Sequence, residues 1–494
     1  MKLQHSSCQS ITLACLMMWG LVLSSGCSNG SDDAPFSQGP TADFSEELTG
    51  GDGPFIGAPA PANLQELGYV EAEYTAVGTA VSYRSPNDLT GDGHWAFEPD
   101  GSAEYRTRIL VRRPQNQSDF SGTVIVEWLN VSGGLDANVE WVNLEEEITR
   151  MGHIWVGVSA QLIGVEGGPV LSGGAGKPGV AGTGLKKLDP ARYASLSHPG
   201  DGYSFDIFTQ VARGLREGGS AMGHMRPQHL IAAGESQSAF AMVTYYNGVQ
   251  PLTQAFDGFL VHSRGAGSLP MVGPGLYAFF TDSLITIPVI LRTDGKAPVM
   301  NIQAENDTTG FLNSMLVRQP DSDTFRLWEI AGTSHGDSRL SVFGSGVPVN
   351  CGLPINDGPQ HFVAKAALHS LDAWLRTGVA PSTAQRLDMT PSNPPSLLRN
   401  VDGIVLGGVR TPQLDVPVDV LSGVPGPTPT KAACFTLGST APLSEERLAE
   451  LYASPEDYMQ RYAASTDAVI QAGFMLEADR EAIIADSDPS RIPN

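Results

Sequence analysis

The stretch "HLIAAGESQSAFAMV" (residues 229–243) decides the fold, because a single serine stands between two apolar runs. Its first five residues have the length of a buried strand, and the run after the polar residues has the length and pattern of a helix. Gly234 precedes Ser236 by two residues, and Ser238 follows it by two. Small residues at these positions let a strand and a helix approach closely around a tight turn. The stretch therefore predicts a strand, a sharp turn that carries Ser236, and a helix.

Strand-like apolar runs alternate with helix-like segments along the chain. We expect strands at 69–83, 104–114, 122–129, 153–160, 229–234, 256–263, 297–304 and 324–332. We expect helices at 203–215, 236–246 and 361–378. Nearly continuous apolar strands are typical of a parallel sheet that is covered on both faces. The order predicts an α/β fold with a mainly parallel central sheet and helices on both faces, with loop or cap insertions at 162–200 and 265–296.

The N-terminus has the features of an export signal. Lys2 is followed by "ITLACLMMWGLVL" (11–23), which has the length of a signal h-region and is short for a membrane span. "LSSGC" then ends at Cys27, before a polar run. We interpret residues 1–27 as a lipoprotein signal with Cys27 lipidated, although Ser24 stands where that pattern has leucine. A cleaved secretory signal is the alternative.

Four segments follow from these patterns. Residues 1–27 are the signal, 28–50 a flexible tether, 51–380 the α/β domain that contains Ser236, and 381–494 a C-terminal extension packed on the core. A proline-rich link, "TPSNPPS", lies near the last boundary. Both readings of the signal predict export, either lipid-anchored in the bacterial cell envelope or periplasmic or secreted. The anchor is the only membrane contact that we expect.

Charge and cysteines restrict the partners. The formal net charge of −23 repels phosphate backbones, so we expect no nucleic acid partner. Beyond the signal region the cysteines are Cys351 and Cys434, a pair that predicts one possible disulfide in an oxidising compartment. Two separate buried thiols are the alternative. No cysteine or histidine spacing suggests a metal, and we expect no cofactor.

Ser236 requires partners, because a serine hydroxyl is a poor nucleophile unless a base and an orienting acid activate it. Where the serine lies on this kind of turn, the chain order is serine, acid, histidine. "WEIAGTSHGD" places His335 after the last expected strand. "VMNIQAENDTT" offers Asp307, our preferred acid, and Glu305, the alternate acid. His262 also follows a strand, but it precedes both acids.

An oxyanion site also needs donors. The backbone N–H of Gln237, the residue after the serine, is one expected donor. The other is expected in "EWLNVSGG", from Asn130 or its neighbour Val131. The alternative is a glycine-rich turn without this role.

The assembled segments resemble a group of bacterial proteins described as alpha/beta hydrolase domain-containing. The resemblance lies in "GTVIVEWLNVSGG", "ARYASLSHPGDGYSFDIFTQVARGL", "GESQSAFAM", "EIAGTSHGD", "CGLPINDGPQHFVAKAAL" and "GGVRTPQLDVPV". It implies the α/β-hydrolase fold and a serine triad on Ser236 and His335, and it implies no particular substrate.

We therefore expect an exported serine hydrolase that cleaves small carboxylic esters through an acyl-enzyme. An amidase, a lactonase or an acyltransferase would use the same triad. A hypothesis of a different class is a surface lipoprotein that binds a ligand on a catalytically silent hydrolase scaffold. The intact order of serine, acid and histidine favours the enzyme.

Overall fold

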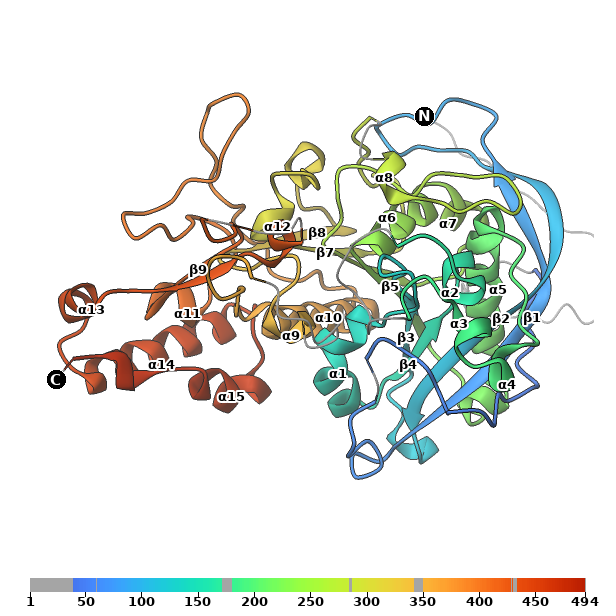
Figure 1. Cartoon of the computed structure of the whole chain (residues 1–494), viewed down its shortest axis with the longest axis horizontal. Helices are drawn as coiled ribbons and strands as arrows, with labels where there is room; N and C mark the ends of the chain where they lie inside the picture. The colour runs from blue at the N-terminus through green and yellow to red at the C-terminus, as the bar shows by residue number, and fades with distance from the viewer. Residues whose placement is uncertain are drawn as a thin grey trace, which may run out of the picture. The chain divides into compact units, whose positions relative to one another are not determined.

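The computed structural model describes residues 39–493 apart from 59, 171–179, 284–286, 342–349, 428 and 430–432. In this part of the chain an eight-stranded sheet has the order β1-β2-β4-β3-β5-β6-β7-β8 (Figure 1). Its strands are β1 (Tyr69–Arg84), β2 (Glu98–Pro114), β3 (Thr123–Trp128), β4 (Ile154–Val158), β5 (His229–Glu235), β6 (Gly258–His262), β7 (Val299–Ala304) and β8 (Phe325–Ile330). Each lies within two residues of an expected strand, except that β2 begins six residues earlier.

Most of the sheet is parallel, as predicted. Strands β3 to β8 pair in parallel, whereas β1 pairs with β2, and β2 with β4, in antiparallel fashion. In the central register, Val126 lies opposite Val156 on one side and Ala232 on the other. The carboxyl ends of the parallel strands therefore share one edge, where open α/β sheets bind ligands.

Helices cover both faces of the sheet, so the predicted α/β architecture is confirmed. On one face, Val124 and Val126 share a buried cluster with residues of α5 (Ser204–Glu217) and α6 (Gln237–Thr244). On the other face, Ile125 shares a cluster with residues of α1 (Val139–Met151) and α10 (Gln360–Thr377). This alternation is why β3 reads as a continuous apolar run.

Short helices occupy many of the connections. They are α2 (Leu162–Glu166), α3 (Leu185–Leu188), α4 (Pro190–Tyr193), α7 (Gln250–Thr253), α8 (Phe280–Ser283) and α9 (Ser338–Ser341). A π-helical turn, Tyr245–Val249, joins α6 to α7. Four of them, α2, α3, α4 and α8, lie in the two glycine- and proline-rich insertions that the sequence predicts.

The C-terminal segment adds α11 (Pro412–Asp415), β9 (Asp419–Ser422), α12 (Cys434–Leu437), β10 (Ser439–Pro442), α13 (Glu445–Leu451), α14 (Pro455–Gln471) and α15 (Arg480–Ala485). Ser454 caps the start of helix α14, because its side chain accepts a hydrogen bond from Asp457 N. Tyr458 and Tyr462 of α14 are buried in the same cluster as residues of α10. The segment therefore packs on the helix layer of the sheet.

The expected tether is wrong in its second half. Residues 39–50 lie along the sheet, where Asp43 bridges to Val77 and Glu47 to Tyr74. Ala42 is buried in the cluster that contains residues of α5, and Leu48 is buried in a separate cluster with Tyr193 and Leu196. Cys27 and the rest of the expected signal lie outside the described residues. None of the helices in the described ranges has the length and hydropathy that a membrane-spanning helix requires.

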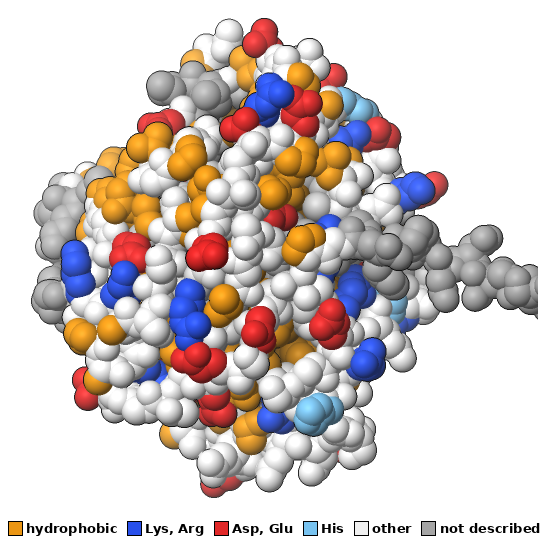
Figure 2. Space-filling model, turned by 90° about the vertical axis from the view of Figure 1, so that its right-hand side faces the viewer, with side chains coloured by type: hydrophobic (Ala, Val, Ile, Leu, Met, Phe, Trp, Pro, Cys, Tyr) orange, Lys and Arg blue, Asp and Glu red, His pale blue; other side chains and the backbone are white. Residues whose placement is uncertain are grey.

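The surface carries mixed charge on the face that Figure 2 shows. Acidic and basic side chains are interspersed there, and apolar side chains gather mainly in its upper part. The net negative charge of the chain is thus not concentrated on this face.

Candidate active site

Ser236 lies on a strained turn between β5 and α6. Its φ of 57° and ψ of −118° are rare for a residue with a side chain. A Cβ added at Gly234 would lie 2.8 Å from the carbonyl oxygen of Ser238. The close approach of strand and helix therefore requires a glycine at 234, and the turn has the strand–serine–helix form that the sequence predicts.

The structure brings Ser236, His335 and Asp307 into one chain of hydrogen bonds. His335 Nε2 lies 2.7 Å from Ser236 Oγ, and His335 Nδ1 lies 2.7 Å from Asp307 Oδ1. Asp307 is fully buried, and its Oδ2 accepts a hydrogen bond of 2.7 Å from Ala304 N. Since Asp307 accepts at Nδ1, the neutral His335 has its free lone pair on Nε2, facing the serine.

The charge around His335 favours its protonated form. Burial lowers the pKa of the imidazole, but Asp307 and then Glu235 outweigh burial and raise the pKa to about 9. The backbone N–H of His335 donates to Asn306 Oδ1 at 2.7 Å, which fixes the loop that carries the ring. This environment stabilises an imidazolium after proton transfer from Ser236.

Glu305, the alternate acid, does not contact His335. Its carboxylate binds the Arg399 guanidinium and accepts hydrogen bonds of 3.0 Å from Gly332 N and Gly423 N. Glu305 and Asp307 lie in one 3-10 turn, Glu305–Asp307, and point to different partners. Glu305 thus joins the C-terminal segment to the core, and Asp307 faces the histidine.

The expected oxyanion donors differ in availability. Gln237 is the first residue of α6, so its backbone N–H has no acceptor within the helix. The expectation for Asn130 is wrong, because its backbone N–H already donates to Ala137 O at 2.8 Å. Its side-chain amide donates to the backbone oxygen of Glu235 at 3.1 Å. Val131 N also donates, to Gln237 Oε1, but over a longer distance of 3.3 Å, so Val131 is the better candidate of the two.

The Gln237 side chain holds the loop after β3, which carries Val131. Its Nε2 donates to Gln161 Oε1 at 2.6 Å, and Gln161 also accepts from the Trp128 indole at 3.0 Å. Gln237 therefore has two roles. Its backbone N–H is a donor at the turn, and its side chain links the loop after β3 to the loop after β4.

One buried residue beside the triad was not predicted. Glu235 directly precedes the serine, its side chain is 4% exposed, and its Oε1 lies 3.6 Å from His335 Nε2. The signal was present in the sequence, because a glutamate ends an otherwise apolar strand. His262, the rejected alternative base, accepts a backbone hydrogen bond from Ser236 N, but its side chain contacts Glu140 and Gln360.

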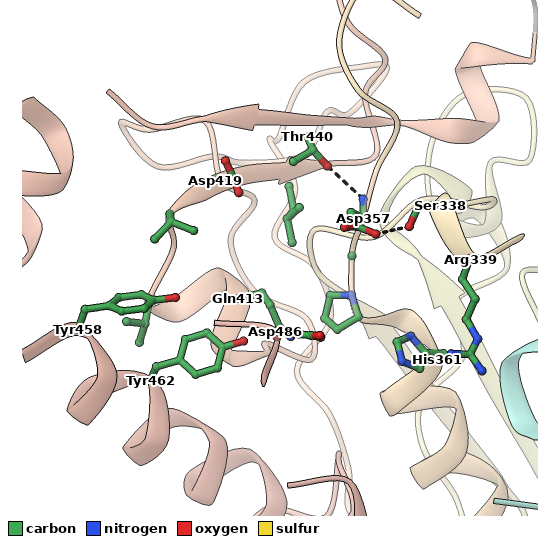
Figure 3. A pocket seen from close by; sticks show the side chains of 15 residues that line it. Ser338, Arg339, Asp357, His361, Gln413, Asp419, Thr440, Tyr458, Tyr462 and Asp486 are labelled. Atoms are coloured by element: carbon green, nitrogen blue, oxygen red, sulfur yellow. Dashed lines mark hydrogen bonds between the residues drawn. The ribbon is translucent and has the colours of Figure 1, made fainter. Parts of the chain in front are cut away.

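A cavity of about 230 Å³ lies where the C-terminal segment meets the core (Figure 3). Its walls include Asp357, Tyr458, Tyr462 and Asp486, and none of the three triad side chains lines it. In the described residues no group of three or more histidine, cysteine, aspartate or glutamate side chains is arranged to bind a metal.

Cys351 and Cys434 form a disulfide. It connects the loop before α10 to the start of α12. Asn306, which holds the His335 backbone, donates its side-chain amide to Phe435 O at 3.1 Å. The disulfide-linked segment therefore contacts the loop beside the triad.

Taken together, a strained serine, a histidine and a buried aspartate form an arrangement that can generate a nucleophile, with backbone N–H groups beside it. The family model of the alpha/beta hydrolase domain (Abhydrolase_10) matches residues 37–485. The chain therefore belongs to this alpha/beta hydrolase family, and its fold is the α/β-hydrolase fold. No curated protein matches it.

Solved structures with a similar fold include several hydrolases. An esterase of Rhizomucor miehei is 11% identical, with 61% of this chain and 84% of that chain covered and a TM-score of 0.29. A serine hydrolase without a lid from Xanthomonas campestris is 14% identical (53% and 85% covered, TM-score 0.27). A carboxyl esterase of Tuber melanosporum is 12% identical (55% and 82% covered, TM-score 0.26). The family assignment rests on the family model and not on these likenesses.

Proposed function

We propose that this hydrolase is a serine esterase that cleaves small carboxylic esters through an acyl-enzyme. The single observation that supports the proposal best is the chain of two 2.7 Å contacts from Ser236 Oγ through His335 to Asp307. Ser236 Oγ attacks the acyl carbonyl while His335 Nε2 takes the hydroxyl proton. His335 then gives that proton to the leaving alcohol oxygen.

The second half of the reaction uses the same groups. Water loses a proton to His335 and attacks the acyl carbonyl, and the carboxylic acid leaves as Ser236 recovers its proton. The Gln237 N–H, with Val131 N–H as the second candidate, donates to the oxyanion that forms in each half. Loss of one such donor costs roughly 10²- to 10³-fold in turnover.

A serine replacement with a matched control tests the proposal. Ser236→Ala is expected to fold normally and to lose at least about 10³-fold in kcat on p-nitrophenyl butyrate. Ser238→Ala removes a buried hydroxyl two residues away that has no hydrogen-bond partner among the described residues, and it should keep activity near that of the wild type. Retained turnover in Ser236→Ala would refute the assignment.

A substrate panel decides the reaction class. Matched p-nitrophenyl esters, anilides and lactones distinguish an esterase from an amidase or a lactonase, and an added alcohol acceptor reveals acyl transfer. A folded wild-type protein that turns over none of them would favour a ligand-binding protein on a silent scaffold.

We also propose that the protein is exported and lipidated on Cys27. The disulfide between Cys351 and Cys434 supports export, because such bonds persist in oxidising compartments. Cys27→Ser in the full chain is expected to move the protein from the membrane fraction to the soluble fraction. Unchanged membrane association would overturn the proposal.

A further inference from the structure

Glu235 places a second carboxyl group next to His335, on the side opposite to Asp307. Its Oε1 lies 3.6 Å from His335 Nε2, whereas Asp307 contacts Nδ1. At 3.6 Å the carboxyl oxygen is beyond a good hydrogen bond, and Ser236 Oγ at 2.7 Å remains the hydrogen-bond partner of Nε2. Any effect of Glu235 on the imidazole therefore acts through charge.

The Glu235 carboxyl group has little other compensation. Among the described residues, no donor forms a hydrogen bond to its oxygens, and His335 is the only basic group paired with it. Asp307, in contrast, also accepts a hydrogen bond from Ala304 N. Burial raises the pKa of Glu235 to about 7, although His335 and His262 oppose the shift. The charge of Glu235 therefore depends strongly on the histidine that faces it.

The neighbouring elements supply the remaining charged and polar groups around Glu235. From β6, His262 is fully buried, and its Nδ1 lies 3.3 Å from Glu140 Oε2 of α1. From α10, the Gln360 amide lies 3.0 Å from His262 Nε2. Asp307 follows β7. Glu140 and His262 thus pair with each other, and Glu235 is left facing His335.

We propose that Glu235 is a positioning residue, whose carboxylate stabilises the His335 imidazolium that forms when Ser236 loses its proton. The inference rests on the proposed hydrolase function and deepens it. The imidazolium is then held between two carboxylates, Asp307 at Nδ1 and Glu235 near Nε2. No bond to Glu235 forms or breaks, and the proton passes only between Ser236, His335 and the substrate oxygens.

Removing this charge has two opposing consequences. Without Glu235, a proton on His335 is less stable, so the pKa of His335 falls and the neutral base persists at lower pH. The same loss makes His335 a weaker base and the transition state less stable. Glu235→Gln is therefore expected to move the acid limb of kcat/KM by about one pH unit toward lower pH, and to lower the alkaline plateau about tenfold. A merely structural role would lower the rate without displacing the limb.

The test measures pH profiles of kcat/KM on p-nitrophenyl butyrate, together with the pH dependence of fluorophosphonate labelling. Glu235→Asp keeps the charge and is expected to restore a limb near the wild-type position. Glu140→Gln is the matched control, because it removes a buried carboxylate that faces His262, and its limb should not move. Should Glu235→Gln fail to fold, Glu235→Ala removes the same charge and is expected to give the same displacement.

Two outcomes overturn the inference. One is a folded Glu235→Gln with an unchanged acid limb, and the other is an equal displacement in Glu140→Gln. Failure of the proposed function is distinguishable, because the wild-type protein would then be neither labelled nor active, and no limb would exist to compare.

Discussion

Replacing Asp307 by asparagine, with Glu305→Gln as the matched control, separates two carboxylates that lie in one short turn. Both side chains are fully buried, and both replacements keep the size and remove one charge. Asp307 Oδ1 lies 2.7 Å from His335 Nδ1, whereas Glu305 binds Arg399 and two backbone N–H groups. We expect Asp307→Asn to lose turnover and Glu305→Gln to lose stability.

The magnitudes follow from these contacts. Asparagine at the acid position of a serine triad leaves the histidine in the wrong tautomer and lowers kcat about 10⁴-fold, which corresponds to about 5.4 kcal/mol. Glu305 accepts from three donors, and glutamine offers one acceptor oxygen in place of two. At least one buried donor then loses its partner, at a cost of about 1–3 kcal/mol. Arg399 retains access to solvent, which keeps the cost within that range.

The assay is kcat on p-nitrophenyl butyrate, combined with the denaturant midpoint of each variant. Asp307→Asn should keep most of its stability and lose nearly all turnover. Glu305→Gln should unfold at a lower denaturant concentration and, while folded, keep kcat within about threefold of the wild-type value. A greater loss of kcat in Glu305→Gln than in Asp307→Asn would refute this account of the triad.

Three further predictions concern the turn, the disulfide and the pH profile. Gly234→Ala should lower kcat by about 10²-fold or more, because the added Cβ would meet the backbone of α6 at 2.8 Å. Gly219→Ala is the control and should be neutral, because a Cβ added there meets nothing within 4 Å. Equal kcat values for the two variants would contradict the close approach of strand and helix. Replacing both Cys351 and Cys434 by serine removes a disulfide between residues 83 positions apart and should lower the free energy of unfolding by about 2–5 kcal/mol. A denaturant midpoint that does not change would argue against the bond. Because the pKa of His335 is raised to about 9 and the base must be neutral, kcat/KM should rise with pH across the alkaline range; a plateau already reached below pH 6.5, the ordinary pKa of histidine, would contradict this.

The sheet was predictable because each parallel strand is buried on both faces. The run at 122–129 became β3, all of whose residues are buried, and the stretch at 229–234 became β5. Helix α1 was missed, since "VEWVNLEEEITRM" carries four glutamates, two of which, Glu140 and Glu147, are buried. Buried acidic residues hide the apolar period on which such a prediction depends.

The composition of residues 39–50 suggested a tether, because pairing with another strand is not visible in a local sequence. Asp43 and Glu47 are residue types that polar linkers commonly contain, and yet they bridge to β1. Side-chain composition predicts disorder only where no long-range partner offers its backbone groups.

The triad was predictable in its order but not in its surroundings. The strand–turn–helix pattern identified Ser236, and the strand ends identified His335. The choice between Asp307 and Glu305 depends on which side chain of one 3-10 turn points to the histidine, and on Arg399, which lies 94 residues from Glu305 in the sequence. Neither the direction of these side chains nor the contact with Arg399 can be inferred from sequence spacing.

Labelling with a fluorophosphonate, followed by peptide mass spectrometry, tests the central claim most directly. Such a probe forms a bond only with a serine oxygen that a neighbouring base has activated. We predict one adduct, on Ser236, that is absent in His335→Ala. A folded wild-type protein that takes up no label, or takes it up on another residue, would contradict the account.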